Sequence, residues 1–194
     1  MKTNNFFQKI NSRINNLIQQ KNIRDKIICK KGCTICCEKV NIFVLPQEIF
    51  LIVNALNKLP FNKRKEIAKR IKKIDEEWDK NVKNKGTHRI TGETAENLIN
   101  EMVYGIRYRC PLLFEKICII YENRPVVCRS YFSDNLESCR EENPVYNLAD
   151  EALEEIKKVY LEKKKDFPLI PLFRNIDFKN NKFVVIDEER IRQL

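Results

Sequence analysis

The sequence predicts a mainly α-helical protein of the α+β class, with few short strands and with helices packed around a cluster of cysteines. Long segments repeat apolar residues at three- and four-residue steps, as amphipathic helices do. Alternating apolar residues are confined to short stretches. All eight cysteines fall in two blocks, at residues 29–37 and 110–139. We expect a single domain over residues 1–194, with a cysteine-cluster core at 29–139 and helical flanks.

The expected elements follow in chain order. A helix over residues 4–28 has an apolar stripe, and a short strand follows the first cysteine block, where Val40, Ile42 and Val44 alternate. Pro46 begins a helix that runs to residue 59, with Glu48 favourably placed near its amino end. The stripe of the first helix comprises Phe6, Phe7, Ile10, Ile14, Leu17 and Ile18.

A longer helix is predicted from Phe61 to Val82. One face is apolar, and the other carries the basic sequence KRKEIAKRIKK, which we expect to be a solvated face because no exposed aromatic residues are interleaved with it. Two more helices are expected, at about 93–106 and at 148–166, and a terminal hairpin that turns at Asn180 and Asn181. The apolar face comprises Ile67, Ile71, Ile74, Trp78 and Val82.

Composition and charge narrow the class of protein. No apolar run approaches the roughly 20 residues needed to span a bilayer, and the amino-terminal stretch is too polar for a secretory signal. We therefore expect a cytoplasmic protein without a membrane partner. The net charge of +10 can indicate nucleic-acid binding. Two zinc ions bound by eight thiolates would reduce the net charge to about +6, which weakens the case for nucleic acid. The expected partners are therefore a metal ion or cluster and a protein.

The spacing of the cysteines favours a metal site over scattered core cysteines. Cys33 and Cys36 have the two-residue separation of a zinc knuckle, and a helical turn would direct the four thiols of the first block to one side. Adjacent Cys36 and Cys37 favour two neighbouring metal sites or a cluster with one thiol left over. The candidate ligands of this metal-centred core are Cys29, Cys33, Cys36, Cys37, Cys110, Cys118, Cys128 and Cys139.

The chemistry leaves Zn²⁺ and an iron–sulfur cluster both open, because thiolates suit either. Disulfides are the alternative, but clustered cysteines in a reducing cytosol more often bind metal. Pro125 is placed to begin a helix with Cys128 in its first turn, where free N–H groups favour a thiolate. Nearby Tyr121, Arg124 and Arg129 are predicted to donate hydrogen bonds to sulfur or to offset its charge.

The two blocks together resemble the YkgJ-like CxxCxxCC cysteine-cluster family of zinc- or iron-chelating domains. The resemblance covers residues 29–139 and is carried by the first-block cysteines and by the strings C-P-x-L, C-x-I-Y and R-P-x-x-C-R, with Cys139 as the last cysteine. It implies eight cysteines gathered into a metal site. Three residues separate Cys29 from Cys33 where the family has two, so Cys29 departs from the family pattern.

Some relatives in that family resemble lysine N-methylases, so a cluster-dependent protein-modifying enzyme is one alternative, and a basic nucleic-acid-binding module is another.

The cysteine spacing at positions 29, 33 and 36 also matches radical S-adenosylmethionine enzymes, but those need a larger α/β barrel and more than four glycines. No catalytic residue is assigned. His88, the only histidine, has no neighbouring carboxylates at motif spacing. The predicted function is binding of zinc or iron.

Overall fold

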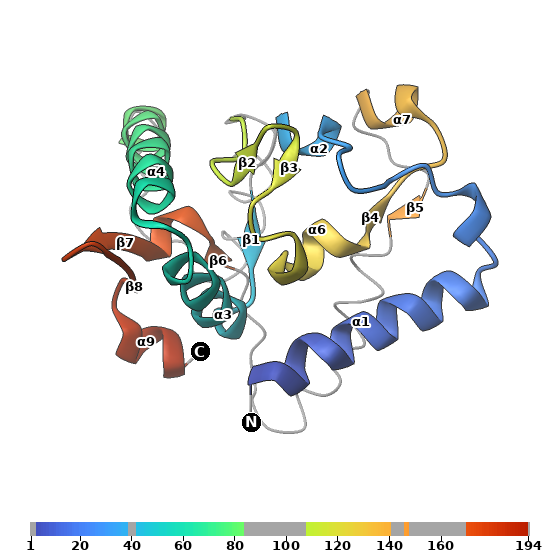
Figure 1. Ribbon diagram of the computed structural model, residues 1–194, viewed down its shortest axis with the longest axis horizontal. Helices are drawn as coiled ribbons and strands as arrows, with labels where there is room; N and C mark the ends of the chain where they lie inside the picture. The colour runs from blue at the N-terminus through green and yellow to red at the C-terminus, as the bar shows by residue number, and fades with distance from the viewer. Residues whose placement is uncertain (1–2, 39–41, 84–107, 141–145, 148–169, 194) are drawn as a thin grey trace.

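The computed structural model describes residues 3–38, 42–83, 108–140, 146–147 and 170–193. In these ranges the chain is mixed helical with strands of two to four residues, which confirms that part of the predicted fold class. Figure 1 shows α3, α4 and the β7–β8 hairpin on one side, α2 and α7 on the other, and α1 along the lower edge. None of the described helices combines the length and apolarity that a membrane span requires.

The first helix is shorter than predicted. Helix α1 covers Thr3–Gln20 and is followed by the 3₁₀ turn η1 at Arg24–Lys26. Asn22 adopts a positive φ of 51°, and the N–H of Ile23 donates to the carbonyl of Ile18. This left-handed ending stops the helix. Ile14 and Ile18 are buried as expected, whereas the side chains of Phe6, Phe7 and Ile10 lie outside the described part of the chain.

The next two helices begin where the sequence predicts. Strand β1 is Phe43–Val44, helix α3 is Pro46–Asn57 and helix α4 is Phe61–Lys83. Glu48 Oε2 accepts a hydrogen bond of 2.9 Å from the N–H of Leu45, which satisfies a free donor at the start of α3. The apolar residues of α4 are buried at Ile67, Ile71 and Ile74. The side chains of Trp78 and Val82 fall outside the described residues.

Short elements form the middle of the chain. Helix α2 is Ile35–Glu38, α6 is Val126–Ser130, and α7 is Leu136–Arg140, with a 3₁₀ turn η2 at Tyr121–Asn123. Strand β2 (Leu113–Phe114) pairs with β3 (Ile117–Cys118), and β4 (Tyr131–Phe132) pairs with β5 (Tyr146–Asn147), both antiparallel. These elements carry or flank the cysteines.

The carboxyl end contains the predicted hairpin. Strand β7 (Ile176–Lys179) pairs with β8 (Lys182–Val185), and Asn180 and Asn181 both have positive φ, at 50° and 63°. That geometry is a tight two-residue hairpin turn, so the prediction is confirmed. Strand β6 (Ile170–Pro171) pairs with β1, η3 is Phe173–Asn175, and α9 is Glu188–Gln193. The loop of His88 and the helices expected at 93–106 and 148–166 lie outside the described residues.

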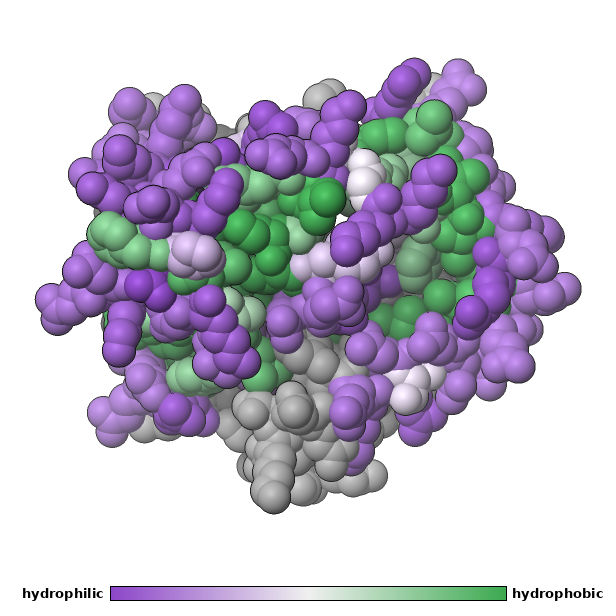
Figure 2. Space-filling view, viewed as in Figure 1, coloured by the Kyte–Doolittle hydropathy of each residue, from purple (hydrophilic) through white to green (hydrophobic). Residues whose placement is uncertain are grey.

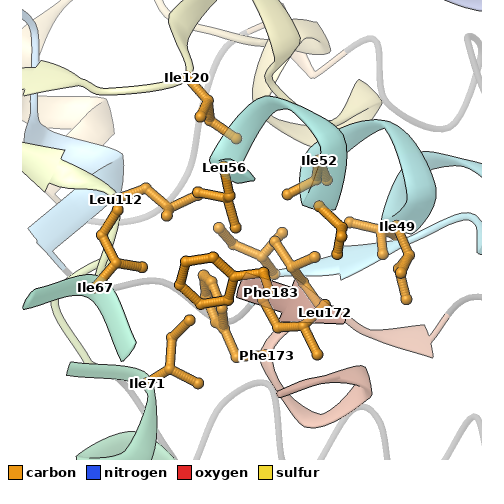
Figure 3. Close-up of a cluster of buried hydrophobic side chains, with 14 of the residues drawn as sticks. Ile49, Ile52, Leu56, Ile67, Ile71, Leu112, Ile120, Leu172, Phe173 and Phe183 are labelled. Carbon is orange, nitrogen blue, oxygen red and sulfur yellow. The ribbon is translucent and has the colours of Figure 1, made fainter. Parts of the chain in front are cut away.

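The described residues form an apolar core. Figure 3 shows side chains from α3, α4 and the carboxyl-terminal elements meeting around Phe173 and Phe183. Cys110 belongs to this core, and Cys37, Cys118 and Cys128 pack against it. The described helices therefore pack around aliphatic and aromatic side chains, and half of the cysteines contact that apolar core.

Candidate metal centre

Two backbone hydrogen bonds join the cysteine blocks. The N–H of Cys110 donates to the carbonyl of Cys37 over 2.7 Å, and the N–H of Ile28 donates to the carbonyl of Ser133 over 3.0 Å. Helix α2 also packs against α7, and Figure 1 shows the two beside each other. The bonded residues are 73 and 105 positions apart in sequence, so distant segments lie side by side, and all eight thiols are free.

The first block does not form the single helical turn that its spacing suggested. Only Cys36 and Cys37 are helical, in α2. Gly32 has φ of +96°, and the N–H of Cys33 donates to the carbonyl of Lys30 over 3.0 Å, so a tight turn precedes the helix. A positive φ is easily adopted by glycine and breaks helical continuity. Cys29 and Cys33 thus reach the site from a loop.

Cys29 lies against the turn that leads into α7. Its Sγ accepts a hydrogen bond of 3.3 Å from the N–H of Ser133, a fully buried residue. Desolvation raises the pKa of Cys29, the N–H of Ser133 opposes that shift, and negative charge on Cys139, Cys33 and Cys36 adds to it. The hydrogen bond to Ser133 thus fixes Cys29 beside the segment that leads to Cys139.

Cys110 and Cys118 are brought together by the β2–β3 hairpin. Leu113 pairs with Cys118 in that hairpin, and its N–H donates to the carbonyl of Cys110 over 3.0 Å. Burial raises the pKa of both thiols, while a backbone N–H two residues further on, from Leu112 or Ile120, donates to each sulfur and lowers it. N–H groups directed at sulfur are a common support for metal-bound thiolates.

Cys128 occupies the first turn of α6, as predicted from Pro125. The expectation that this position favours a thiolate is wrong for the metal-free protein. Desolvation raises the pKa of Cys128, as do the charges of Cys36 and Cys118, and the opposing charge of Arg124 is smaller. A buried thiol therefore stays protonated until a cation displaces the proton.

Cys36 and Cys37 are consecutive residues of helix α2. A hydrogen bond between their thiols is the largest cause that raises the pKa of Cys36, followed by desolvation. Cys36 is exposed, whereas Cys37 is half-buried against the apolar core.

Arg124 is a positively charged residue that lowers the pKa of three of the cysteines. Its guanidinium lies 3.8 Å from the centroid of the Tyr121 ring, and its Nε donates to the carbonyl of Tyr121 over 3.1 Å. Its positive charge lowers the pKa of Cys36, Cys118 and Cys128, against the larger effects that raise them. Arg124 thus partly offsets the charge of thiolates.

Arg129 braces the same segment. It donates to the carbonyl of Arg124 over 2.6 Å, to the carbonyl of Glu122, and to Asn11 Oδ1 of α1 over 2.6 Å. Its charge also lowers the pKa of Cys118. Three residues were expected to support the thiols. The charges of Arg124 and Arg129 lower the pKa of Cys118, whereas Tyr121 contacts Arg124 through its ring and its carbonyl.

Glu48 is a residue of the site that the sequence did not reveal. Only 1% exposed, it accepts a hydrogen bond on Oε1 from the N–H of Val126 over 2.7 Å, besides the bond at the start of α3. Desolvation raises the pKa of Glu48 to about 7. The sequence shows its local position in α3, but only the fold shows that it also caps α6, the helix of Cys128.

Arg70 of α4 holds the segment between Cys110 and Cys118. Its guanidinium donates to the carbonyl of Leu113 over 2.8 Å and to that of Pro111 over 3.4 Å, and it lies 4.0 Å from the centroid of Phe114. Lys63 lies over the same ring at 4.5 Å. Figure 2 shows a hydrophilic surface over α4, yet part of its basic face contacts the protein itself.

The donor set suits a soft metal. Thiolates are preferred ligands of Zn²⁺ and of iron–sulfur clusters, and neither Ca²⁺ nor Mg²⁺ favours them. Within the described ranges, no three cysteine, histidine or acidic side chains already stand together as a formed metal site. The two blocks are joined, but their thiols do not yet surround a common point. This is usual for sites that form only when the metal binds.

The fold and these side chains define a small, helix-rich protein whose two cysteine blocks are brought together at the edge of an apolar core. The chain belongs to the CxxCxxCC family, described as a "putative zinc- or iron-chelating domain", which matches residues 28–166. The match confirms the family resemblance and extends 27 residues past Cys139, over the helix expected at 148–166. No curated protein and no solved structure gives a significant match.

Proposed function

We propose that this protein binds zinc or iron through thiolates of its two cysteine blocks, and that the bound metal fixes those blocks against the apolar core. The observation that carries the proposal is the junction of the blocks: the hydrogen bond from Cys110 to Cys37 joins two blocks that each carry four free thiols. Backbone N–H groups donate to sulfur at Cys29, Cys110 and Cys118. Such donors stabilise the deprotonated form that metals bind.

The ligands are drawn from Cys29, Cys33, Cys36, Cys37, Cys110, Cys118, Cys128 and Cys139. When bound, the metal supplies a cationic centre that replaces the thiol protons. Arg124 and Arg129 offset the negative charge that remains, and Glu48 and Arg70 hold α6 and the β2–β3 hairpin in place. Helix α2 has no buried residue and Leu136 of α7 is 50% exposed, so apolar packing holds these helices weakly and the metal has a structural role there.

A structural role has an energetic consequence. For structural zinc sites in small domains, the free energy of binding is on the order of 10 kcal/mol and contributes directly to folding. We also propose that the protein works in a reducing compartment such as the cytoplasm, because its eight cysteines are free thiols. Residues 1–194 would then form one domain, held together by the apolar core and the metal.

The test is anaerobic purification of the full chain, followed by metal analysis and a visible absorption spectrum. We expect a stoichiometric amount of zinc with a colourless protein, or iron with acid-labile sulfide and a brown colour. The first result assigns structural zinc and the second an iron–sulfur cluster. A folded protein that contains neither metal, and takes up neither under reducing conditions, contradicts the proposal.

A further inference from the structure

We propose that the thiols form two adjoining metal centres of unequal stability rather than one. The outer centre takes Cys29, Cys33 and Cys139; the inner centre takes Cys110, Cys118 and Cys128; Cys36 and Cys37 give one thiol to each. This inference rests on the proposed function and adds the number of sites and the division of ligands between them.

Contact with the apolar core separates the two sets of three. Cys110 is 6% exposed and belongs to that core, and Cys118 and Cys128 are half-buried and pack against it. Cys29, Cys33 and Cys139 are also half-buried, but they are not among the described residues that make up or contact the core. The inner set therefore lies against the core, whereas the outer set lies on loops and on the short helix α7.

Different contacts assemble each set. The outer set is drawn together by the hydrogen bond between Cys29 and Ser133 and by the packing of α2 on α7, which carries Cys139. The inner set is drawn together by the hydrogen bond between Cys110 and Cys37 and by the β2–β3 hairpin. In Figure 1 the hairpin and α7 lie on opposite sides of α2, so α2 is the boundary between the two sets.

The adjacent pair is suited to serve two ions. Successive residues of a helix point about 100° apart, so two neighbouring thiols do not easily face a single ion. Four thiolates complete a tetrahedral site, and three cysteines on each side need one more. Cys36 and Cys37 are consecutive residues of α2, so the two centres adjoin.

The charges around the centres differ. Arg124 acts on both Cys118 and Cys128 of the inner set, and Arg129 acts on Cys118. Neither arginine is among the main causes of the pKa shift of Cys29. Cations near a tetrathiolate offset its net negative charge. The inner centre therefore holds its metal more tightly than the outer centre, both because of these arginines and because of its contact with the apolar core.

Zinc is the probe for the test. Full-length protein purified in the presence of Zn²⁺ and reductant is analysed by native mass spectrometry and then challenged with a chelator. We expect two zinc ions per chain, released in two phases whose rates differ at least tenfold. Cys139→Ser should retain one slowly released ion, and Cys118→Ser should retain one rapidly released ion; Cys36→Ser and Cys37→Ser should each lose one ion.

A single zinc ion per chain, or one release phase with both ions leaving together, overturns the division into two centres and leaves the proposed function standing. The wild-type result is decisive even where a variant fails to fold. Complete loss of metal from folded Cys139→Ser and folded Cys118→Ser alike also overturns it. No zinc bound to the wild-type protein overturns the two zinc centres, and the proposed function falls as well only if the folded protein takes up no iron either.

Discussion

The N–H of Cys110 donates to the carbonyl of Cys37 over 2.7 Å, so the first buried cysteine of the second block is bonded to the last cysteine of the first block. Both residues also contact the apolar core, Cys110 as a member and Cys37 at its margin. The core thus positions the junction from which the remaining cysteines extend. Substitutions at this junction should affect metal content and folding together.

Replacement of Cys110 by serine tests that coupling. The variant should lose metal, and its free energy of unfolding should fall by at least about 2 kcal/mol, because a hydroxyl is left in an apolar site and the metal no longer links the blocks. Metal analysis and urea unfolding measure the two effects. Ile117→Ser is the matched control, since Ile117 lies in the same hairpin but is 43% exposed, and it should change stability by only about 0.5 kcal/mol. Equal metal content in Cys110→Ser and in the control would count against the coupling.

Arg70→Gln should loosen the hairpin that carries Cys118. The substitution removes the hydrogen bonds to the carbonyls of Leu113 and Pro111 and the contact with Phe114. We expect a loss of about 1 kcal/mol, because the site is partly solvated, and faster release of metal to a chelator. Lys69→Gln, at an exposed position one residue away on α4, should behave like the wild type. If both variants released metal at the same rate, the positioning role of Arg70 would be wrong.

Glu48→Gln separates the capping role of Glu48 from its charge. The amide offers one carbonyl acceptor, as the protonated carboxyl group does, whereas the carboxylate offers one to both Leu45 and Val126. At pH 5, where Glu48 is protonated in the folded protein, the stability of the variant should lie within about 1 kcal/mol of the wild type. Urea unfolding of both proteins in the same metal state measures the difference.

The pH dependence of that difference has a definite sign. Burial raises the pKa of Glu48 from 4.5 to about 7, so the folded protein binds this proton more tightly than the unfolded chain does. The resulting stabilisation is fully present below pH 4.5 and is lost as the pH rises through about 7. Because the amide does not titrate, the wild type should lose about 2.5 kcal/mol of stability relative to Glu48→Gln between pH 5 and pH 8. A gap that is independent of pH would show that Glu48 titrates normally.

Arg124→Gln should weaken metal retention without unfolding the protein. It removes the cation that offsets charge on Cys36, Cys118 and Cys128, and we expect affinity to fall by about tenfold, the lower end for residues that support metal ligands. Competition with a chromogenic chelator measures the affinity. Arg192→Gln is the control, because Arg192 also lies over an aromatic ring, that of Phe50 at 4.4 Å, on an element that carries no cysteine. Unchanged affinity in Arg124→Gln would remove Arg124 from the site.

Periodicity was sufficient to predict α3, α4 and the terminal hairpin. Pro46 and the apolar repeat of α4 specify those helices locally, and two asparagines in succession specify the turn at 180–181. The early end of α1 was not predicted, because an apolar stripe does not show that Asn22 will adopt a left-handed conformation. The same limit applies to Gly32, whose positive φ interrupts the helical spacing of the first cysteine block.

The sequence indicates candidate ligands but not how the fold arranges them. The two cysteine blocks and Arg124 are evident from spacing and motif alone. Glu48 and Arg70 are not, because each acts on a segment at least 40 residues away, through hydrogen bonds that only the folded chain creates. The apolar centre of the fold was also missed, since Leu172, Phe173 and Phe183 join α3 and α4 from the far end of the sequence.

X-ray absorption at the metal edge tests the central claim most directly, because it reports the atoms bound to the metal. For anaerobically purified full-length protein we predict a first shell of sulfur, at about 2.3 Å if the metal is zinc. A first shell of nitrogen and oxygen, or a protein that binds no zinc or iron while its eight thiols remain free and reactive, would contradict it.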